Sequence, residues 1–152
     1  GTLVDALARV ERAEAPALVL DATTSERALE CARRLRIAFE NNDRRGCTER
    51  FVAKSGQVFD PRGSRPFLGA GEIGKYFDSV FQSLKIERAE LTAEQWDNGR
   101  LFQDLVIEVV ALTGKRATLE ARWELAFDEN AEIACFTTNW NTHAIAELVV
   151  TG

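Results

Sequence analysis

The hydrophobic residues of this chain recur at helical spacing in its first half and alternate with polar residues in its second half. The longest helical repeat runs from Arg27 to about Asn42, with one apolar face opposite arginines and glutamates. That face consists of Leu29, Ala32, Leu35 and Phe39. Thr23 and Glu26 have the spacing of a capping box, which predicts that this helix begins near Ser25.

Three further helices are predicted around this one. A stripe of leucine and valine over Thr2–Ala15 predicts a short amphipathic helix that stops before Pro16. Gly46–Ala53 is expected to form another short helix. The last runs from about Gly71 to Leu84, and its apolar side is formed by Ile73, Tyr76, Phe77, Val80, Phe81 and Leu84.

The second half of the chain predicts a meander of four long strands. Their ranges are Ile86–Trp96, Leu101–Leu112, Lys115–Phe127 and Glu132–Asn141. The Asn98-Gly99 pair between the first two is typical of a type I′ hairpin turn. A brief strand at Gln57–Asp60, closed by a proline-rich turn, precedes the meander. This order predicts an α+β fold, a curved antiparallel β-sheet with helices packed on its concave face.

Composition and charge exclude several classes of binding partner. The 152 residues are enough for one domain, and 45% hydrophobic with 28% charged residues is ordinary for a globular protein. The formal net charge of −5 argues against nucleic acid and anionic membranes as partners. No segment reaches the roughly 20 apolar residues that span a bilayer, and the start is not that of a signal peptide, so we expect a cytoplasmic protein.

Few residues suit metal or nucleophilic chemistry. Cys31, Cys47 and Cys135 are an odd number without Cys-x-x-Cys spacing, which favours a reducing compartment over a disulfide scaffold or a zinc site. His143 is the only histidine, which excludes most zinc and serine hydrolases. We therefore expect no metal and no cofactor. The chain starts at Gly1 and contains no methionine, which indicates a trimmed or processed chain.

One segment resembles a known family. The sequence from Val58 to Pro66, with Gly69 and the helix Glu72–Phe81 after it, is similar to the corresponding stretch of bacterial ketosteroid isomerases. These enzymes belong to the NTF2-like, or SnoaL-like, superfamily of cone-shaped α+β proteins. The resemblance covers residues 25–145 as the NTF2-like domain, with residues 1–24 as an N-terminal helical extension and 146–152 as a C-terminal tail. It implies a homodimer that associates through the outer face of the sheet.

The resemblance implies a role for Asp60. This residue falls where the isomerases place the aspartate that moves a proton between two carbons of the substrate, and such a general base contributes about 10²–10⁴-fold. The two hydrogen-bond donors of the isomerases have no counterpart, because their positions fall near Leu35 or Arg36 and near Trp123. An aspartate before proline also commonly accepts backbone N–H bonds in a turn, so this structural role stays open.

The same resemblance implies an apolar pocket for a small hydrophobic molecule. The residues expected to line it are Phe39, Tyr76, Phe81, Gln103, Trp123, Phe136, Thr138 and Trp140. Arg122 and Glu124 have the i, i+2 spacing of the water-activating groups in epoxide hydrolases of this fold, but the polar face of their strand favours a surface or dimer-interface ion pair. The protein is thus either an isomerase-like or SnoaL-like enzyme, a non-catalytic ligand-binding or dimerisation module, or an accessory domain of a larger protein.

Overall fold

The computed structural model describes residues 14–141, so most of the predicted helix Thr2–Ala15, His143 and the tail 146–152 lie outside the described residues. The elements follow one another as α2 (Ala22–Glu40), α3 (Arg44–Thr48), β1 (Gln57–Phe59), β2 (Phe67–Leu68), α4 (Gly69–Ser83), β3 (Leu84–Asp97), β4 (Arg100–Ala111), β5 (Arg116–Phe127) and β6 (Ile133–Trp140). None of the helices described is long and apolar enough to cross a membrane.

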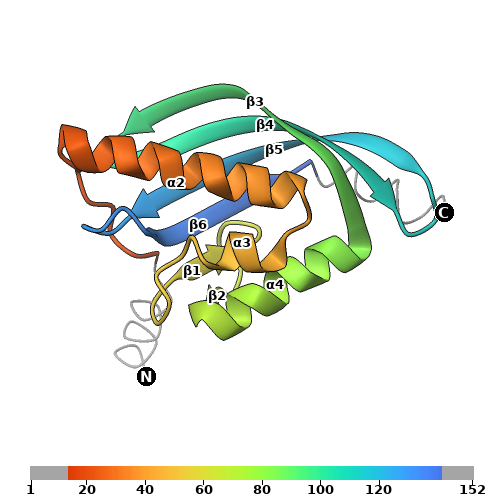
Figure 1. Cartoon of the computed structure of the whole chain (residues 1–152), viewed down its shortest axis with the longest axis horizontal. Helices are drawn as coiled ribbons and strands as arrows, with labels where there is room; N and C mark the ends of the chain where they lie inside the picture. Colours follow the sequence, from red (N-terminus) through yellow and green to blue (C-terminus); the bar gives the residue numbers. More distant parts are fainter. Residues whose placement is uncertain (1–13, 142–152) are drawn as a thin grey trace.

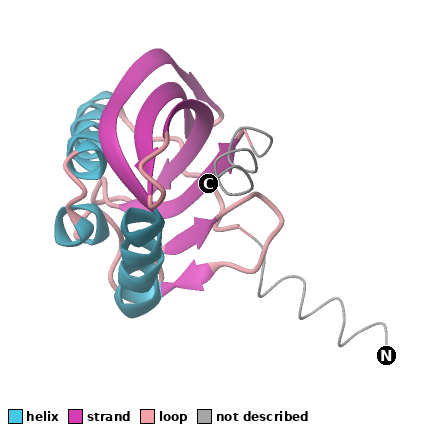
Figure 2. Ribbon diagram, turned by 90° about the vertical axis from the view of Figure 1, so that its right-hand side faces the viewer, coloured by secondary structure: helices cyan, strands magenta, loops and turns pink. Residues whose placement is uncertain are grey.

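Six strands form one curved, unclosed sheet in the order β2-β1-β6-β5-β4-β3, and the helices pack on its concave face (Figures 1 and 2). The predicted α+β cone is therefore confirmed. The sheet is antiparallel as predicted except at one pair, because β1 runs parallel to β6 with Val58 opposite Phe136. No hairpin joins these two strands, so no turn fixes their relative direction.

The starts of the helices differ slightly from the predicted ones. The carboxylate of Asp21 accepts the N–H of Thr24 at 2.7 Å, so α2 begins at Ala22 and the predicted capping box at Thr23 lies inside the helix. An aspartate two residues earlier provides a cap of at least equal quality, which the spacing alone does not distinguish. The short second helix likewise begins earlier than predicted, at Arg44, because Asp43 accepts the N–H of Gly46.

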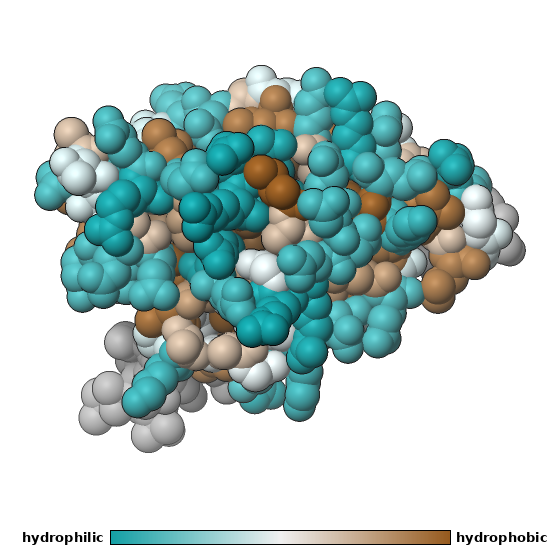
Figure 3. Space-filling view, viewed as in Figure 1, coloured by the Kyte–Doolittle hydropathy of each residue, from teal (hydrophilic) through white to brown (hydrophobic). Residues whose placement is uncertain are grey.

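The helices and the core face of the sheet enclose one hydrophobic core. We call the face that carries Leu105, Ile107 and Leu119 the core face, and the opposite one the outer face. α2 contributes Phe39, whose ring contacts those of Phe81, Trp123 and Trp140. The side of α2 turned to the viewer in Figure 3 is mostly hydrophilic, as expected for an amphipathic helix.

Residues 14–20, which we call the N-terminal segment, begin on the outer face and end at Leu20, which packs against the main core. The N–H of Ala15 donates to Oε1 of Gln57 at 2.7 Å. Ala15 and Ala17 pack against a small second cluster of Phe59, Ala126 and Cys135. Glu14 forms ion pairs with Arg62 and Arg100. The described part of the predicted extension is therefore held against the sheet.

The β3–β4 hairpin contacts this segment at Gly99, which has a φ of +81° in the predicted Asn98-Gly99 turn. A Cβ at Gly99 would lie 2.3 Å from the carbonyl oxygen of Leu18, whereas one at Gly114, with a similar φ of +86°, would meet nothing within 4 Å. We expect Gly114→Ala to lower the melting temperature by about 2–6 °C through backbone strain alone. Gly99→Ala should lower it by at least about 3 °C more. Equal losses in thermal unfolding would mean that the N-terminal segment contributes nothing here.

Candidate functional site

A cleft of about 420 Å³ opens between α4, the loop after β1 and the end of β6. Most of its wall is apolar. It is lined by Asp60, Pro61, Phe67, Lys75, Tyr76, Ser79, Val80, Ser83, Leu84 and Trp140. Asp60 is the one carboxylate and Lys75 the one cation among these lining residues. The cleft thus presents a single acid group within a mainly hydrophobic wall.

The position of Asp60 follows from the short strand before it. Side chains alternate between the two faces of a strand. Val58 lies on the core face, buried opposite Phe136, so Asp60, two residues on, is directed to the same side. The turn after it carries the chain away into the Pro61–Pro66 loop. Asp60 is consequently half-buried at the mouth of the cone.

Helix α4 brings a hydrogen-bond donor to this carboxylate. Tyr76 is buried on the same helix face as Ile73 and Phe77, and its hydroxyl donates to Oδ2 of Asp60 at 2.7 Å. The side chain of Trp140, from the end of β6, lines the same cleft and lowers the pKa of Asp60. The carboxylate is therefore held by the Tyr76 hydroxyl and lies among residues from elements far apart in the sequence.

These surroundings change the acidity of both groups. Burial raises the pKa of Asp60, and the hydrogen bond from Tyr76 and the neighbouring Trp140 side chain oppose this effect. Burial and the neighbouring charge of Asp60 raise the pKa of Tyr76, so the phenol keeps its proton and remains a donor. A carboxylate that is more basic than usual and held in one orientation is suited to accept a proton from carbon.

We expect Tyr76→Phe to raise the pKa of Asp60 further, because the substitution removes a hydrogen bond that stabilises the ionised carboxylate. Titration of the Asp60 side-chain carboxyl by NMR would then show proton release at higher pH than in the wild type. Ser79→Ala alters the same cleft without removing a donor to Asp60 and serves as the control. An unchanged or lowered pKa in Tyr76→Phe would contradict this description of the site.

The structure separates the residues predicted to line the pocket into two groups. Asp60, Tyr76 and Trp140 meet at the cleft. The remaining ones do not line it and lie in the aromatic interior instead: Phe39, Phe81, Gln103, Trp123, Phe136 and Thr138. Trp123 is 1% exposed and makes edge contacts with Phe39 and Phe136. The interior of the cone is therefore filled with side chains. The sequence pattern indicated only that such residues share one face of the sheet, not whether a pocket lies between them.

The positions of the two missing isomerase donors are occupied by structural groups. At the first position, Leu35 is fully buried in the core, and the guanidinium of Arg36 donates to the carbonyl oxygen of Ala89 at 3.3 Å. At the second position, Trp123 is buried in the core. None of these three residues lines the cleft.

Three polar residues of the cleft wall were not predicted from the sequence. Lys75, Ser79 and Ser83 recur four residues apart along α4, beside the apolar row of Tyr76, Val80 and Leu84. This polar row lies next to the apolar side of α4. The helical repeat is therefore the sequence signal that could have identified these three residues. Which edge of the apolar side faces the cleft depends on how α4 docks against the sheet.

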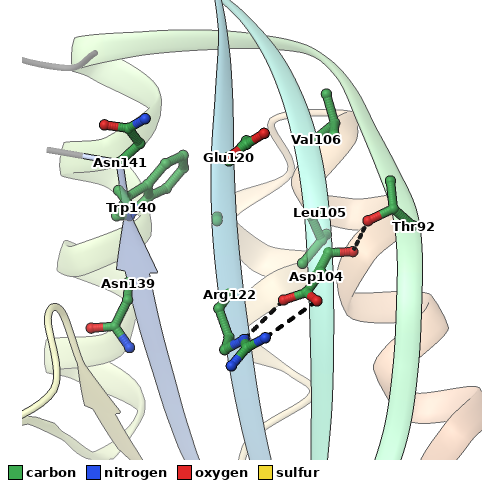
Figure 4. A pocket seen from close by; sticks show the side chains of 10 residues that line it. Thr92, Asp104, Leu105, Val106, Glu120, Arg122, Asn139, Trp140 and Asn141 are labelled. Carbon is green, nitrogen blue, oxygen red and sulfur yellow. Dashed lines mark hydrogen bonds and ion pairs between the residues drawn. The ribbon is translucent and has the colours of Figure 1, made fainter. Parts of the chain in front are cut away.

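A second hollow, of about 490 Å³, lies over strands β3 to β6 (Figure 4). Its lining is largely polar and includes Glu120, Asn139 and an exposed ion pair in which Arg122 binds Asp104 at 2.9 Å. Glu124 is paired with Arg62. Arg122 and Glu124 are thus on the outer face, as predicted, but each has its own partner within the chain and they do not pair with each other.

The comparisons with known proteins concern the fold. Neither protein-family models nor curated proteins gave a match. Among solved structures, an NTF2-like protein of unknown function from Burkholderia pseudomallei superposes with a TM-score of 0.71 at 18% identity, over 81% of this chain and 97% of that one. TerC, co-crystallised with polyporic acid, also gives 0.71 at 18% identity, over 82% of this chain and 98% of its own.

A protein from Catenulispora acidiphila with a ketosteroid isomerase-like fold, in complex with trimethylamine, has a TM-score of 0.67 at 11% identity, covering 76% of this chain and 88% of that one. At such identities the likeness concerns the fold and not the chemistry. The chain has the NTF2-like fold that the segment around Asp60 predicted.

Proposed function

We propose that this protein binds a small hydrophobic carbonyl compound in the cleft and that Asp60 is the general base of a proton transfer next to the carbonyl. The observation that carries the proposal is the half-buried carboxylate of Asp60 in a mainly apolar cleft, held by the Tyr76 hydroxyl at 2.7 Å. The ketosteroid isomerase-like and SnoaL-like folds of its structural neighbours support the same class of reaction by analogy.

The proposed step begins with a proton on the carbon between the carbonyl and a neighbouring C=C bond. Asp60 takes this proton, and the electron pair of the C–H bond moves toward the carbonyl oxygen to give a dienolate. Asp60 then returns the proton to the far carbon of the former double bond. Tyr76 orients the carboxylate throughout, and no external oxidant or reductant is needed.

A second candidate function is non-catalytic binding of an apolar ligand, in this protein or as an accessory domain of a larger one. It is favoured by the absence of both isomerase donors, since Leu35 or Arg36 stands at the position of one and Trp123 at that of the other. Leu35 and Trp123 are buried in the core, and Arg36 binds a backbone carbonyl. Removing one donor to a developing oxyanion typically costs about 10²–10³-fold in rate. The experiment must therefore distinguish a slow isomerase from a protein that only binds its ligand.

The experiment follows isomerisation of 3-cyclohexenone to its conjugated isomer by NMR, with the wild type and with Asp60→Asn. Turnover by the wild type alone supports the enzyme. Equal turnover by both proteins rules out Asp60 as the base. A ligand-induced rise in melting temperature in both proteins, without turnover in either, supports the binding function instead.

A further inference from the structure

A row of polar side chains crosses the hydrophobic core face of the sheet. Gln103 on β4 lies directly opposite Trp123 on β5, and Trp123 lies directly opposite Thr138 on β6. Their exposed fractions are 2% for Gln103, 1% for Trp123 and 1% for Thr138. Opposite residues on one sheet face are about 5 Å apart at Cβ, so Trp123 has Gln103 on one side and Thr138 on the other as its direct neighbours.

Each member of this row has one polar atom without a hydrogen-bond partner among residues 14–141. These atoms are Oε1 of Gln103, Nε1 of Trp123 and Oγ1 of Thr138. The amide of Gln103 has a determined orientation, because its Nε2 donates to Oε2 of Glu94 at 2.7 Å and a carboxylate only accepts. Its Oε1 is therefore an acceptor that is not directed to Glu94.

The three atoms together define one chemical requirement. Trp123 offers a donor, Gln103 an acceptor, and the Thr138 hydroxyl can act as either. Leaving such atoms unpaired in a core is costly, and native proteins rarely do so. A carbonyl or carboxylate oxygen only accepts and would leave Gln103 unpaired. A hydroxyl group accepts from Trp123 or Thr138 and donates to Gln103.

We propose that Gln103, Trp123 and Thr138 form a binding site for a hydroxyl group, supplied either by a ligand or by an ordered water molecule. The row leads toward the cleft, since the parallel pairing ends with Phe59 opposite Thr137, and Asp60 and Thr138 are the next residues of the two segments. A hydroxylated ligand with its apolar part in the cleft would extend along this row if the aromatic side chains of the interior rearrange. The proposal that a ligand supplies the hydroxyl group rests on the proposed function, whereas the proposal that a water molecule supplies it does not.

The test compares Thr138→Val with Thr137→Val, two nearly isosteric losses of a buried hydroxyl from adjacent residues. Thr137 is also buried, and its Oγ1 likewise has no hydrogen-bond partner among residues 14–141, but its side chain is on the outer face, away from the row. If water occupies the row, Thr138→Val should lower the melting temperature of the ligand-free protein by about 2–4 °C, because the substitution removes a satisfied hydrogen bond. Thr137→Val removes a buried hydroxyl that is not part of the row, so its loss should be smaller than that of Thr138→Val.

If the hydroxyl comes from a ligand, Thr138→Val should leave the ligand-free melting temperature unchanged or higher. 2-Naphthol should then shift the Trp123 indole N–H resonance, which Trp123→Phe identifies, and 2-methylnaphthalene should not. Thr138→Val should weaken 2-naphthol binding about tenfold, as expected for the loss of one hydrogen bond. If Thr138→Val is stabilising and 2-naphthol leaves the Trp123 resonance unmoved, the proposal is overturned. None of these readouts depends on turnover, so a failed isomerase assay leaves them interpretable.

Discussion

Asp60→Asn is expected to reduce the rate of 3-cyclohexenone isomerisation by about 10²–10⁴-fold, because the amide cannot accept the proton that the carboxylate takes from carbon. The amide keeps the size and the position of the carboxyl group, so the cleft and its apolar wall are preserved. The ketone should still raise the melting temperature of the variant. A loss confined to the chemical step would assign the role of base to Asp60.

The pH dependence gives an independent check on the same residue. Because burial raises the pKa of Asp60, turnover by the wild type should increase with pH through a value above that of an ordinary aspartate. A rate that is independent of pH across this range, in a protein with measurable turnover, would contradict the assignment.

Stability should respond to Asp60 in the opposite direction. The pKa of this group is higher in the folded than in the unfolded chain, so the folded state holds its proton more tightly. Its contribution to stability is therefore greatest below the unfolded pKa and falls as pH rises through the folded pKa. Asp60→Asn, which carries no charge, should not lower the melting temperature at neutral pH. A large loss there would indicate that the carboxylate is structural.

Periodicity predicted most of the fold because each element has a strong local signal. The alternation in Lys115–Phe127 distinguishes the two faces of β5, and Asn98-Gly99 forms the expected turn with positive φ at both residues. The parallel pairing of β1 with β6 has no such signal. It joins segments more than seventy residues apart, and no turn with characteristic residues connects them, so nothing local predicts the pairing.

The candidate site was predictable only in part, for a related reason. The resemblance around Asp60 drew attention to the carboxylate, and the helical repeat placed Tyr76 on the apolar side of its helix. That Tyr76 bonds Asp60 depends on how α4 docks under the sheet. How deeply each residue is buried also could not be predicted from the sequence. Phe136 and Trp140 share one face of β6, yet Trp140 lines the cleft and Phe136 is buried in the core.

The interior of the cone is the feature that most limits what can bind. Phe39 is 2% exposed, and its ring centroid lies 5.2 Å from that of Trp123, 5.6 Å from Phe81 and 6.2 Å from Trp140. Such rings add to their burial about 0.5–1.5 kcal/mol per favourable pair. Phe39 therefore joins α2 and α4 to the core face of the sheet, and it is packed as a core residue rather than as the wall of an open pocket.

Phe39→Ala is accordingly expected to lower the free energy of unfolding by about 3–5 kcal/mol, the range for removing a fully buried aromatic ring. Chemical denaturation measures this loss, and Phe102→Ala, a half-buried phenylalanine of β4 on the outer face, is the matched control. If Phe39 lined an open pocket, truncation would mainly enlarge that pocket, and the loss would be no greater than that of Phe102→Ala. A large loss specific to Phe39 would mean that ligands are confined to the cleft beside Asp60 unless the aromatic rings rearrange.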